Sequence, residues 1–224
     1  MSKFYFTIHD LETIKEAVKE AESKTSGEIA VAFIKESDDY ARYELIFAIF
    51  AGFFYFLGLM FFSQRIEHLM QDMFWGYSSS YLLMLYGFTT FIIMGVAYAL
   101  SNLQFIDRII IPKSAMKRKV QQRAVRHFME SGVYNTQNRN GVLIFISDLE
   151  RRVELLADRA INEKIPKDQW ENIVSHVIDG VHTNQTVRHL AEAIKECGNL
   201  LARHFPIQPD NTNELSDDVH VLEN

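Results

Sequence analysis

Acidic residues follow two strand-like runs of the sequence and are the first candidates for chemistry. The run Glu28–Ile34 (EIAVAFI) is followed by Asp38 and Asp39, and the run Gly141–Ser147 (GVLIFIS) is followed by Asp148. If the runs form parallel strands, their carboxyl ends meet at one edge of the sheet, where open α/β sheets bind ligands. Carboxylates gathered there favour Ca²⁺ or Mg²⁺, and a bound ion could direct water against a phosphate ester. The alternative is that these acidic turn residues are solvated.

Two arginines lie beside the second acidic turn. A guanidinium can hold phosphate or carboxylate with two parallel hydrogen bonds, so Arg151 and Arg152 are candidates for an anion site. Alternation along a third strand-like run, Arg151–Ala157, places Arg152 and Glu154 on one face and Val153 on the other. At least one arginine therefore faces solvent, and the alternative is a pair of surface charges on a hairpin.

Other catalytic signatures are missing from the sequence, which contains no GxGxxG, GxxxxGK[ST] or HExxH motif. His176, His182 and His189 fall in a region with helical periodicity and are expected to be partly exposed rather than metal ligands. Cys197 is the single cysteine, and its place on an apolar helix stripe indicates a buried structural thiol. The net charge of −6 gives no reason to expect nucleic-acid binding.

Two apolar blocks interrupt the polar sequence. Residues 45–62 and 81–100 contain no charged side chain, and runs of this length match the hydrocarbon thickness of a bilayer. In lipid, such segments must form helices to satisfy their backbone groups. Apolar residues at helical spacing in the connector Ser63–Ser80, followed by Trp75, predict an interfacial helix that closes a transmembrane hairpin. The alternative is a pair of core helices in a soluble bundle, although such helices are usually shorter.

Basic residues are distributed unevenly around the two blocks. The connector carries Arg65, whereas a basic stretch follows the second block: Arg108, Lys113, Lys117, Arg118, Lys119, Arg123 and Arg126. Because basic residues gather on the cytoplasmic side of membrane proteins, both termini are predicted to be cytoplasmic. The amino end lacks the apolar core of a signal peptide. The sequence therefore predicts an integral membrane protein that is embedded in the lipid bilayer.

The polar segments on either side of the hairpin are expected to fold together. Residues 1–44 are too few for a domain, whereas residues 101–205 are within the usual range, so the hairpin at 45–100 is an insertion. Asp10 is expected to cap the first helix. A strand, a crossover helix and a second strand predict a parallel pair, and the next run pairs antiparallel. The expected α/β fold is a small three-layer α/β/α sandwich, and the polar tail 206–224 is expected to pack loosely or lack order.

Several motifs together resemble the TPM domain family. They are TSGEIAVAFI, NGVLIFISDLERRVELLADRAI, the helix around Trp170, and LARHFP followed by NEL. The sequence is most similar to a bacterial branch of membrane proteins that carry a TPM domain. The positions in matching motifs are Ser26, Gly27 and Glu28 before the first strand, and Asn140 and Gly141 at the start of the second.

The resemblance implies an α/β/α sandwich, weak acid phosphatase activity in some members, calcium binding in others, and roles in maintaining membrane complexes. Many members continue the third strand into a glycine-rich stretch, whereas this chain has the segment 157–160 (ADRA). The predicted function is a binding or accessory module anchored at the cytoplasmic face of the bacterial inner membrane. The alternative is a weak phosphomonoesterase assisted by Ca²⁺ or Mg²⁺. Expected partners are a membrane protein and a second copy of the chain, packed through Gly87 and Gly95.

Overall fold

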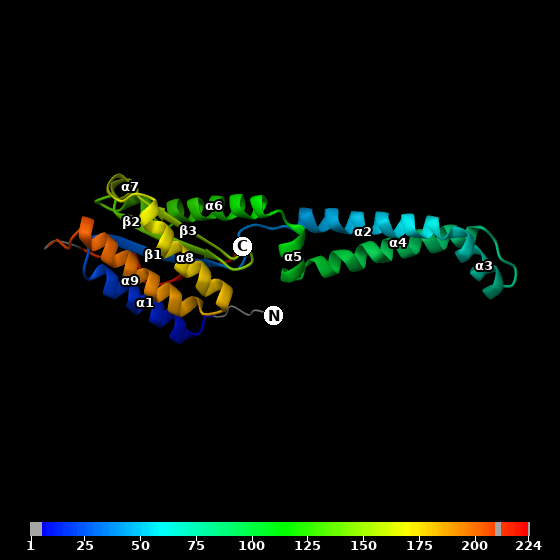
Figure 1. The fold of residues 1–224 in the computed structure, drawn as a ribbon, viewed down its shortest axis with the longest axis horizontal. Coiled ribbons are helices and arrows are strands. Elements are labelled where there is room, and N and C mark those ends of the chain that lie inside the picture. Colours follow the sequence, from blue (N-terminus) through cyan, green and yellow to red (C-terminus); the bar gives the residue numbers. More distant parts are fainter. Residues whose placement is uncertain (1–5, 209–211, 224) are drawn as a thin grey trace. The chain divides into compact units, whose positions relative to one another are not determined.

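The computed structural model describes residues 6–208 and 212–223 and divides the chain into two compact units. The first unit combines residues 1–38 with residues 113–224, and the second unit comprises residues 39–112. The second unit contains the apolar hairpin and extends beyond it on both sides. Two segments far apart in the sequence therefore build one domain (Figure 1).

The described part of the first unit contains a four-stranded sheet in the order β3-β2-β1-β4. Its strands are β1 (Glu28–Ile34), β2 (Gly141–Ser147), β3 (Arg152–Ala157) and β4 (His220–Leu222). β1 runs parallel to β2 and to β4, and β2 pairs antiparallel with β3. The predicted parallel pair and the predicted hairpin are therefore both confirmed. β1 and β2 are apolar throughout, which favours central strands that are buried on both faces.

Helices cover both faces of this sheet (Figure 1). The larger core lies under α1 (Ile8–Glu22), α7 (Arg159–Lys164), α8 (Asp168–Thr183) and α9 (Thr186–His204). The smaller core lies under α6 (Lys113–Glu130), next to the short 3-10 helix η1 (Val133–Asn135). Ile29, Val31 and Phe33 of β1 enter the larger core, and Ala30 and Ala32 enter the smaller one. Strand alternation thus fills two cores at once, and the predicted three-layer sandwich is confirmed.

The N-cap expected for the first helix is corrected by the structure. Thr7, not Asp10, is the N-cap of α1. The Thr7 hydroxyl accepts the Asp10 backbone N–H at 3.1 Å, and the Asp10 carboxylate accepts the Thr7 N–H at 2.8 Å. Asp10 is therefore the N3 residue of a capping box, a reciprocal arrangement that satisfies two helix-end donors.

The described part of the polar tail adds a short strand to the sheet, against the expectation of loose packing, whereas residues 209–211 and 224 lie outside the described residues. His220–Leu222 form β4 and pair with residues 32–34 of β1. His127 of α6 lies 3.1 Å from His220, measured between Nε2 and Nδ1. The tail could be recruited because β1 otherwise presents an unpaired edge, which is a template for a strand of almost any composition.

The second unit contains α2 (Ala41–Phe61), α3 (Ser63–Met73), α4 (Ser80–Ser101) and α5 (Gln104–Ile110). Within the described residues, α2 and α4 are the helices long and apolar enough to cross a membrane. Their most apolar windows are only 17% and 11% buried, so they do not form a soluble core within this unit. Gly52 of α2 is buried against Met94 of α4, where any side chain would collide with the methionine. No neighbour lies within 4 Å of a Cβ placed at Gly87 or Gly95.

Candidate functional site

The predicted motif positions meet at the amino ends of β1 and β2. Glu28 and Gly141 are opposite one another in the register, and the Asn140 side-chain amide donates to the Ser26 carbonyl. The Gly27 N–H donates to the Thr25 hydroxyl at 3.0 Å. These residues join the two strands and the loop before β1, so their first role is structural.

The Glu28 carboxylate at this edge holds the returning tail. It accepts the backbone N–H groups of Glu214 and Leu215 at 3.3 and 3.2 Å. Burial raises the pKa of Glu28 above its usual range, although the two N–H donors oppose the shift. Burial also raises the pKa of the neighbouring Glu22 to about 8, while its carboxylate accepts the Ile29 N–H at 2.7 Å. Glu22 and Glu28 thus form an acidic cluster at this edge, and their carboxylates hold the backbone of β1 and of the returning tail.

The acidic candidates at the carboxyl edge have protein partners. Asp38 forms an ion pair with Lys119 at 2.7 Å, and Asp39 accepts the Ala41 N–H at 2.9 Å at the start of α2. Asp148 is buried in the turn after β2, where its N–H donates to the Ile34 carbonyl at 3.1 Å. The hydrogen-bonded turn brings Asp148 to the end of β1, as the parallel pairing requires. The cation site built on these three carboxylates stays a prediction.

A buried polar network that the sequence patterns do not predict lies at the same edge. The Ser37 N–H donates to Glu150 at 3.0 Å, and the hydroxyls of Ser37 and Ser147 lie 2.8 Å apart. The Ser147 hydroxyl also donates to the Glu150 carboxylate. All three residues are buried. Such a network fixes the loop after β1 against the β2–β3 turn, since a buried carboxylate requires donors.

The two candidate arginines occupy different environments. Arg151 is exposed in the turn and has a φ of 48°, a left-handed conformation uncommon for a side-chain-bearing residue. Arg152 is partly buried, and its Nε has no hydrogen-bond partner among the described residues. Val153 enters the larger core on the opposite face, as alternation predicts. An anion site at Arg151 and Arg152 stays a prediction.

A groove of about 530 Å³ runs along β3, the free edge of the sheet. Its apolar lining comes from β3 and α8: Val153, Leu155, Leu156, Ala157, Trp170, Val174 and Ile178. Its polar rim includes Glu154, Lys167 and Glu171. The groove therefore combines an apolar floor with strand backbone that, among residues 6–208 and 212–223, has no neighbouring strand on its outer side.

Hydrogen-bond alternation shows which backbone groups of β3 face the groove. The Asp158 N–H donates to the Gly141 carbonyl at 2.9 Å, and the antiparallel register continues from this pair along the hairpin. Every second residue of an antiparallel strand bonds to the same neighbour. The N–H and C=O groups of Val153, Leu155 and Ala157 therefore point away from β2.

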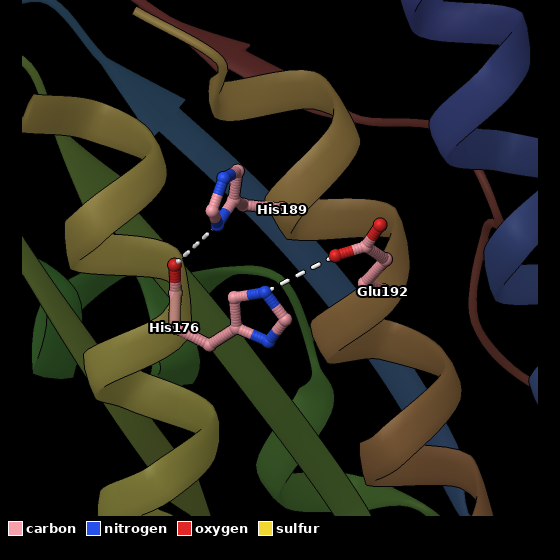
Figure 2. Close-up of side chains that lie close together, drawn as sticks. All are labelled: His176, His189 and Glu192. Carbon is pink, nitrogen blue, oxygen red and sulfur yellow. Dashed lines mark hydrogen bonds and ion pairs between the residues drawn. The ribbon is translucent and has the colours of Figure 1, made fainter. Parts of the chain in front are cut away.

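Two of the three helical histidines come together with an acidic residue. His176 of α8 and His189 and Glu192 of α9 form a cluster whose potential ligand atoms all lie within 4.8 Å of one another (Figure 2). In the part of the chain that the structure describes, this is the one such group of three histidine, cysteine or acidic residues. His182 is exposed outside it. His189 and Glu192 are three residues apart on α9, but His176 comes from α8, so no single sequence motif contains all three residues.

Comparisons with known proteins show a similar fold in one solved structure and a match to one family model over part of the chain. The NMR structure of the BA42 protein from the psychrophilic bacterium Bizionia argentinensis is similar in fold, with a TM-score of 0.59 and 18% identity over 99% of both chains. No curated protein matches the sequence. A family model described as the TPM domain matches residues 106–199. The resemblance to the TPM domain family is thereby confirmed over residues 106–199, which span α6, the β2–β3 hairpin and the following helices.

Proposed function

We propose that this protein is a membrane-anchored binding module whose TPM domain captures an extended segment of a partner protein along β3. The single observation that carries the proposal is the apolar groove beside a strand edge with outward-facing backbone groups. An extended peptide can add to such an edge as a new strand, with main-chain hydrogen bonds supplying affinity and alternate side chains supplying specificity.

The groove defines the chemistry of its occupant. Side chains on the α8 face of an added strand would contact Trp170, Val174 and Ile178, which favours apolar residues at alternate positions. Burial raises the pKa of Glu154, so a lysine or arginine opposite Glu154 would stabilise its charged form. The preferred occupant is therefore an extended apolar segment with a basic residue on its other face.

Membrane anchoring rests on α2 and α4. Large side chains such as Phe54 and Phe91 are 65% and 75% exposed, and a contiguous apolar surface of this kind indicates contact with lipid. α3 has no buried residue among its own, and the following Trp75 is fully exposed, in agreement with an interfacial position. With the basic residues on α6, these features support a hairpin whose termini are cytoplasmic in a bacterial inner membrane.

Peptide binding can be tested with the full chain in detergent micelles. The probe is a fluorescent hexapeptide that alternates valine with lysine and threonine, measured by anisotropy. We expect saturable binding and slower hydrogen exchange at Val153, Leu155 and Ala157. Two N-methylated peptides provide the matched control: methyl groups on the amides that face β3 abolish binding, whereas methyl groups on the alternate amides do not. Equal binding of both methylated peptides would contradict strand addition.

Membrane orientation requires a separate experiment. Cys197 is buried, so single cysteines can be introduced by Ser78→Cys in the connector and Lys167→Cys in the TPM domain. We expect an impermeant maleimide to label Ser78→Cys in right-side-out vesicles and Lys167→Cys only after permeabilisation. The reverse pattern would overturn the predicted topology without affecting the peptide site.

Phosphomonoester hydrolysis is the second candidate, because Asp148 and Glu150 are buried together at the sheet edge where α/β folds bind ligands. Hydrolysis of para-nitrophenyl phosphate that depends on Mg²⁺ and disappears in Asp148→Asn would favour this candidate. Hydrolysis unchanged by Asp148→Asn would reject it.

A further inference from the structure

The cluster of His176, His189 and Glu192 lies on the paired helices α8 and α9, apart from the groove and from the acidic turns. His176 Nε2 is 3.1 Å from a Glu192 carboxylate oxygen. The two imidazole rings are nearly perpendicular, with centroids 4.8 Å apart. Figure 2 shows the two rings and the carboxylate converging between the helices.

Local helix packing creates this convergence. Asn184 ends α8 in a left-handed conformation, with a φ of 57°, and so turns the chain back into α9. Gly180 of α8 lies directly against His189, since a Cβ at Gly180 would be 2.5 Å from the His189 Cβ. The absence of a side chain at Gly180 lets His189 approach the turn of α8 that carries His176. His189 and Glu192 are three residues apart in α9 and share one face.

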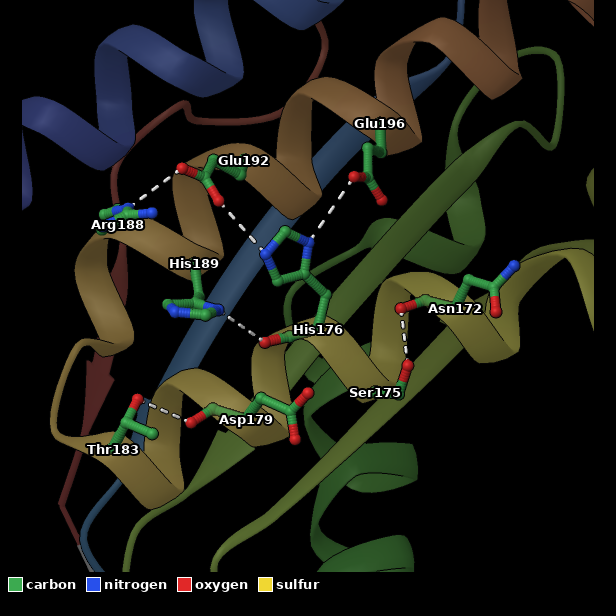
Figure 3. Close-up of polar contacts among 9 residues, drawn as sticks. All are labelled: Asn172, Ser175, His176, Asp179, Thr183, Arg188, His189, Glu192 and Glu196. Atoms are coloured by element: carbon green, nitrogen blue, oxygen red, sulfur yellow. Dashed lines mark hydrogen bonds and ion pairs between the residues drawn. The ribbon is translucent and has the colours of Figure 1, made fainter.

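Further polar contacts surround the cluster (Figure 3). His176 Nδ1 is 3.5 Å from a Glu196 carboxylate oxygen, which leaves Nε2 directed at Glu192. His189 Nδ1 lies 3.2 Å from the His176 backbone carbonyl. A carboxylate or carbonyl on one nitrogen of an imidazole is the usual outer-shell arrangement of a metal-binding histidine. Arg188 competes for the cluster, because its Nε contacts the other oxygen of Glu192 at 3.1 Å.

We propose that His176, His189 and Glu192 form a binding site for a divalent first-row transition ion such as Zn²⁺. Two imidazoles and one carboxylate are a ligand set that suits zinc, whereas calcium and magnesium prefer all-oxygen sets. Ligands that share a tetrahedral zinc ion at its usual bond lengths lie about 3.4 Å apart. The 3.1 Å separation of His176 Nε2 and Glu192 is close to this value, and the potential ligand atoms of all three residues lie within 4.8 Å of one another.

The site is open to solvent on one side. The side chains of His176 and Glu192 are 29% and 43% exposed, so three protein ligands leave a coordination position for water or for an external ligand. Bound metal would also join α8 to α9 through their side chains. The ion is therefore expected to exchange with solution and to stabilise the helix pair that packs on the sheet.

Zinc binding can be measured by isothermal titration of the full chain, with affinity tags removed, in micelles at pH 7.5. We expect one Zn²⁺ per chain, and Co²⁺ as a second probe should develop visible absorption typical of tetrahedral coordination. His176→Ala and His189→Ala should each weaken binding by roughly 100-fold or more, and Glu196→Gln by roughly 10-fold to 100-fold, as for outer-shell partners elsewhere. The matched control is His182→Ala, which replaces an exposed histidine of α8, the helix that carries His176. This variant should bind Zn²⁺ like the wild type.

A gain of affinity separates the site from a folding defect. Arg188→Ala removes the cation that occupies Glu192 and should tighten Zn²⁺ binding several-fold, which no misfolded variant would do. Absence of binding at millimolar Zn²⁺, equal loss in His182→Ala and His176→Ala, or weaker binding in Arg188→Ala would each overturn the proposal.

Discussion

The histidine pair between α6 and the tail predicts that acid releases β4 from the sheet. His127 is buried on α6 and contacts His220 of β4 at 3.1 Å. Burial, together with the nearby His220 and Arg123, lowers the pKa of His127 to about 4 from its ordinary value of 6.5, while Glu130 opposes the shift. A released tail would expose His127 to water and restore the ordinary pKa. Docking of the tail therefore requires the neutral imidazole.

The sign and size of the effect follow from proton linkage. Between about pH 4 and 6.5 the undocked state binds more protons at His127 than the docked state, so docking weakens as the pH falls. Each unit of pKa shift corresponds to about 1.4 kcal/mol, so the loss between pH 7 and pH 5 is about 2 kcal/mol. This loss corresponds to a roughly 30-fold decrease in the docking equilibrium constant, and the effect is complete below about pH 4.

Hydrogen exchange followed by mass spectrometry provides the assay. Protection factors of the segment 212–223, corrected for the intrinsic pH dependence of exchange, should fall roughly 30-fold between pH 7 and pH 5 in the wild type. The variant His127→Gln has no imidazole to protonate and should show a much smaller decrease. The exposed His182→Gln serves as the control and should behave like the wild type. The same decrease in His127→Gln and in the wild type would refute the reasoning.

Three further predictions concern packing. Gly52→Leu should destabilise the α2–α4 pair by about 1–3 kcal/mol through collision with Met94, measured by thermal unfolding in micelles. The control Gly58→Leu should unfold at nearly the wild-type temperature, because a Cβ at Gly58 meets no atom within 4 Å. Cys197 should resist iodoacetamide in the folded chain and react after denaturation, because burial raises the pKa of its thiol to about 12; rapid modification of the folded chain, seen by mass spectrometry, would contradict its burial. Asn140→Ala should lower stability by about 1–3 kcal/mol in urea titrations, because it removes a buried hydrogen bond between the segments that precede β1 and β2, and an unchanged midpoint would contradict that role.

The sequence by itself determined the elements whose signal is local. The bounds of β1 and β2 were predicted residue for residue, because each is a short apolar run bounded by polar turn residues. The long apolar helices were equally clear, since no charged residue interrupts them. Burial of Cys197 followed from its helical spacing. These features depend on periodicity and composition within one segment, which a single sequence contains in full.

Only the tertiary structure decided the features that join distant segments. β4 has three residues and a polar neighbourhood, and it becomes a strand because β1 offers it an open edge. His176 and Glu192 belong to different helices, so their meeting depends on how α8 and α9 pack around Gly180. The same holds for the β3 groove, whose two walls come from a strand and a later helix. Sequence patterns fix which face of each element is apolar, but the rotation and contact of two elements are set by packing between them.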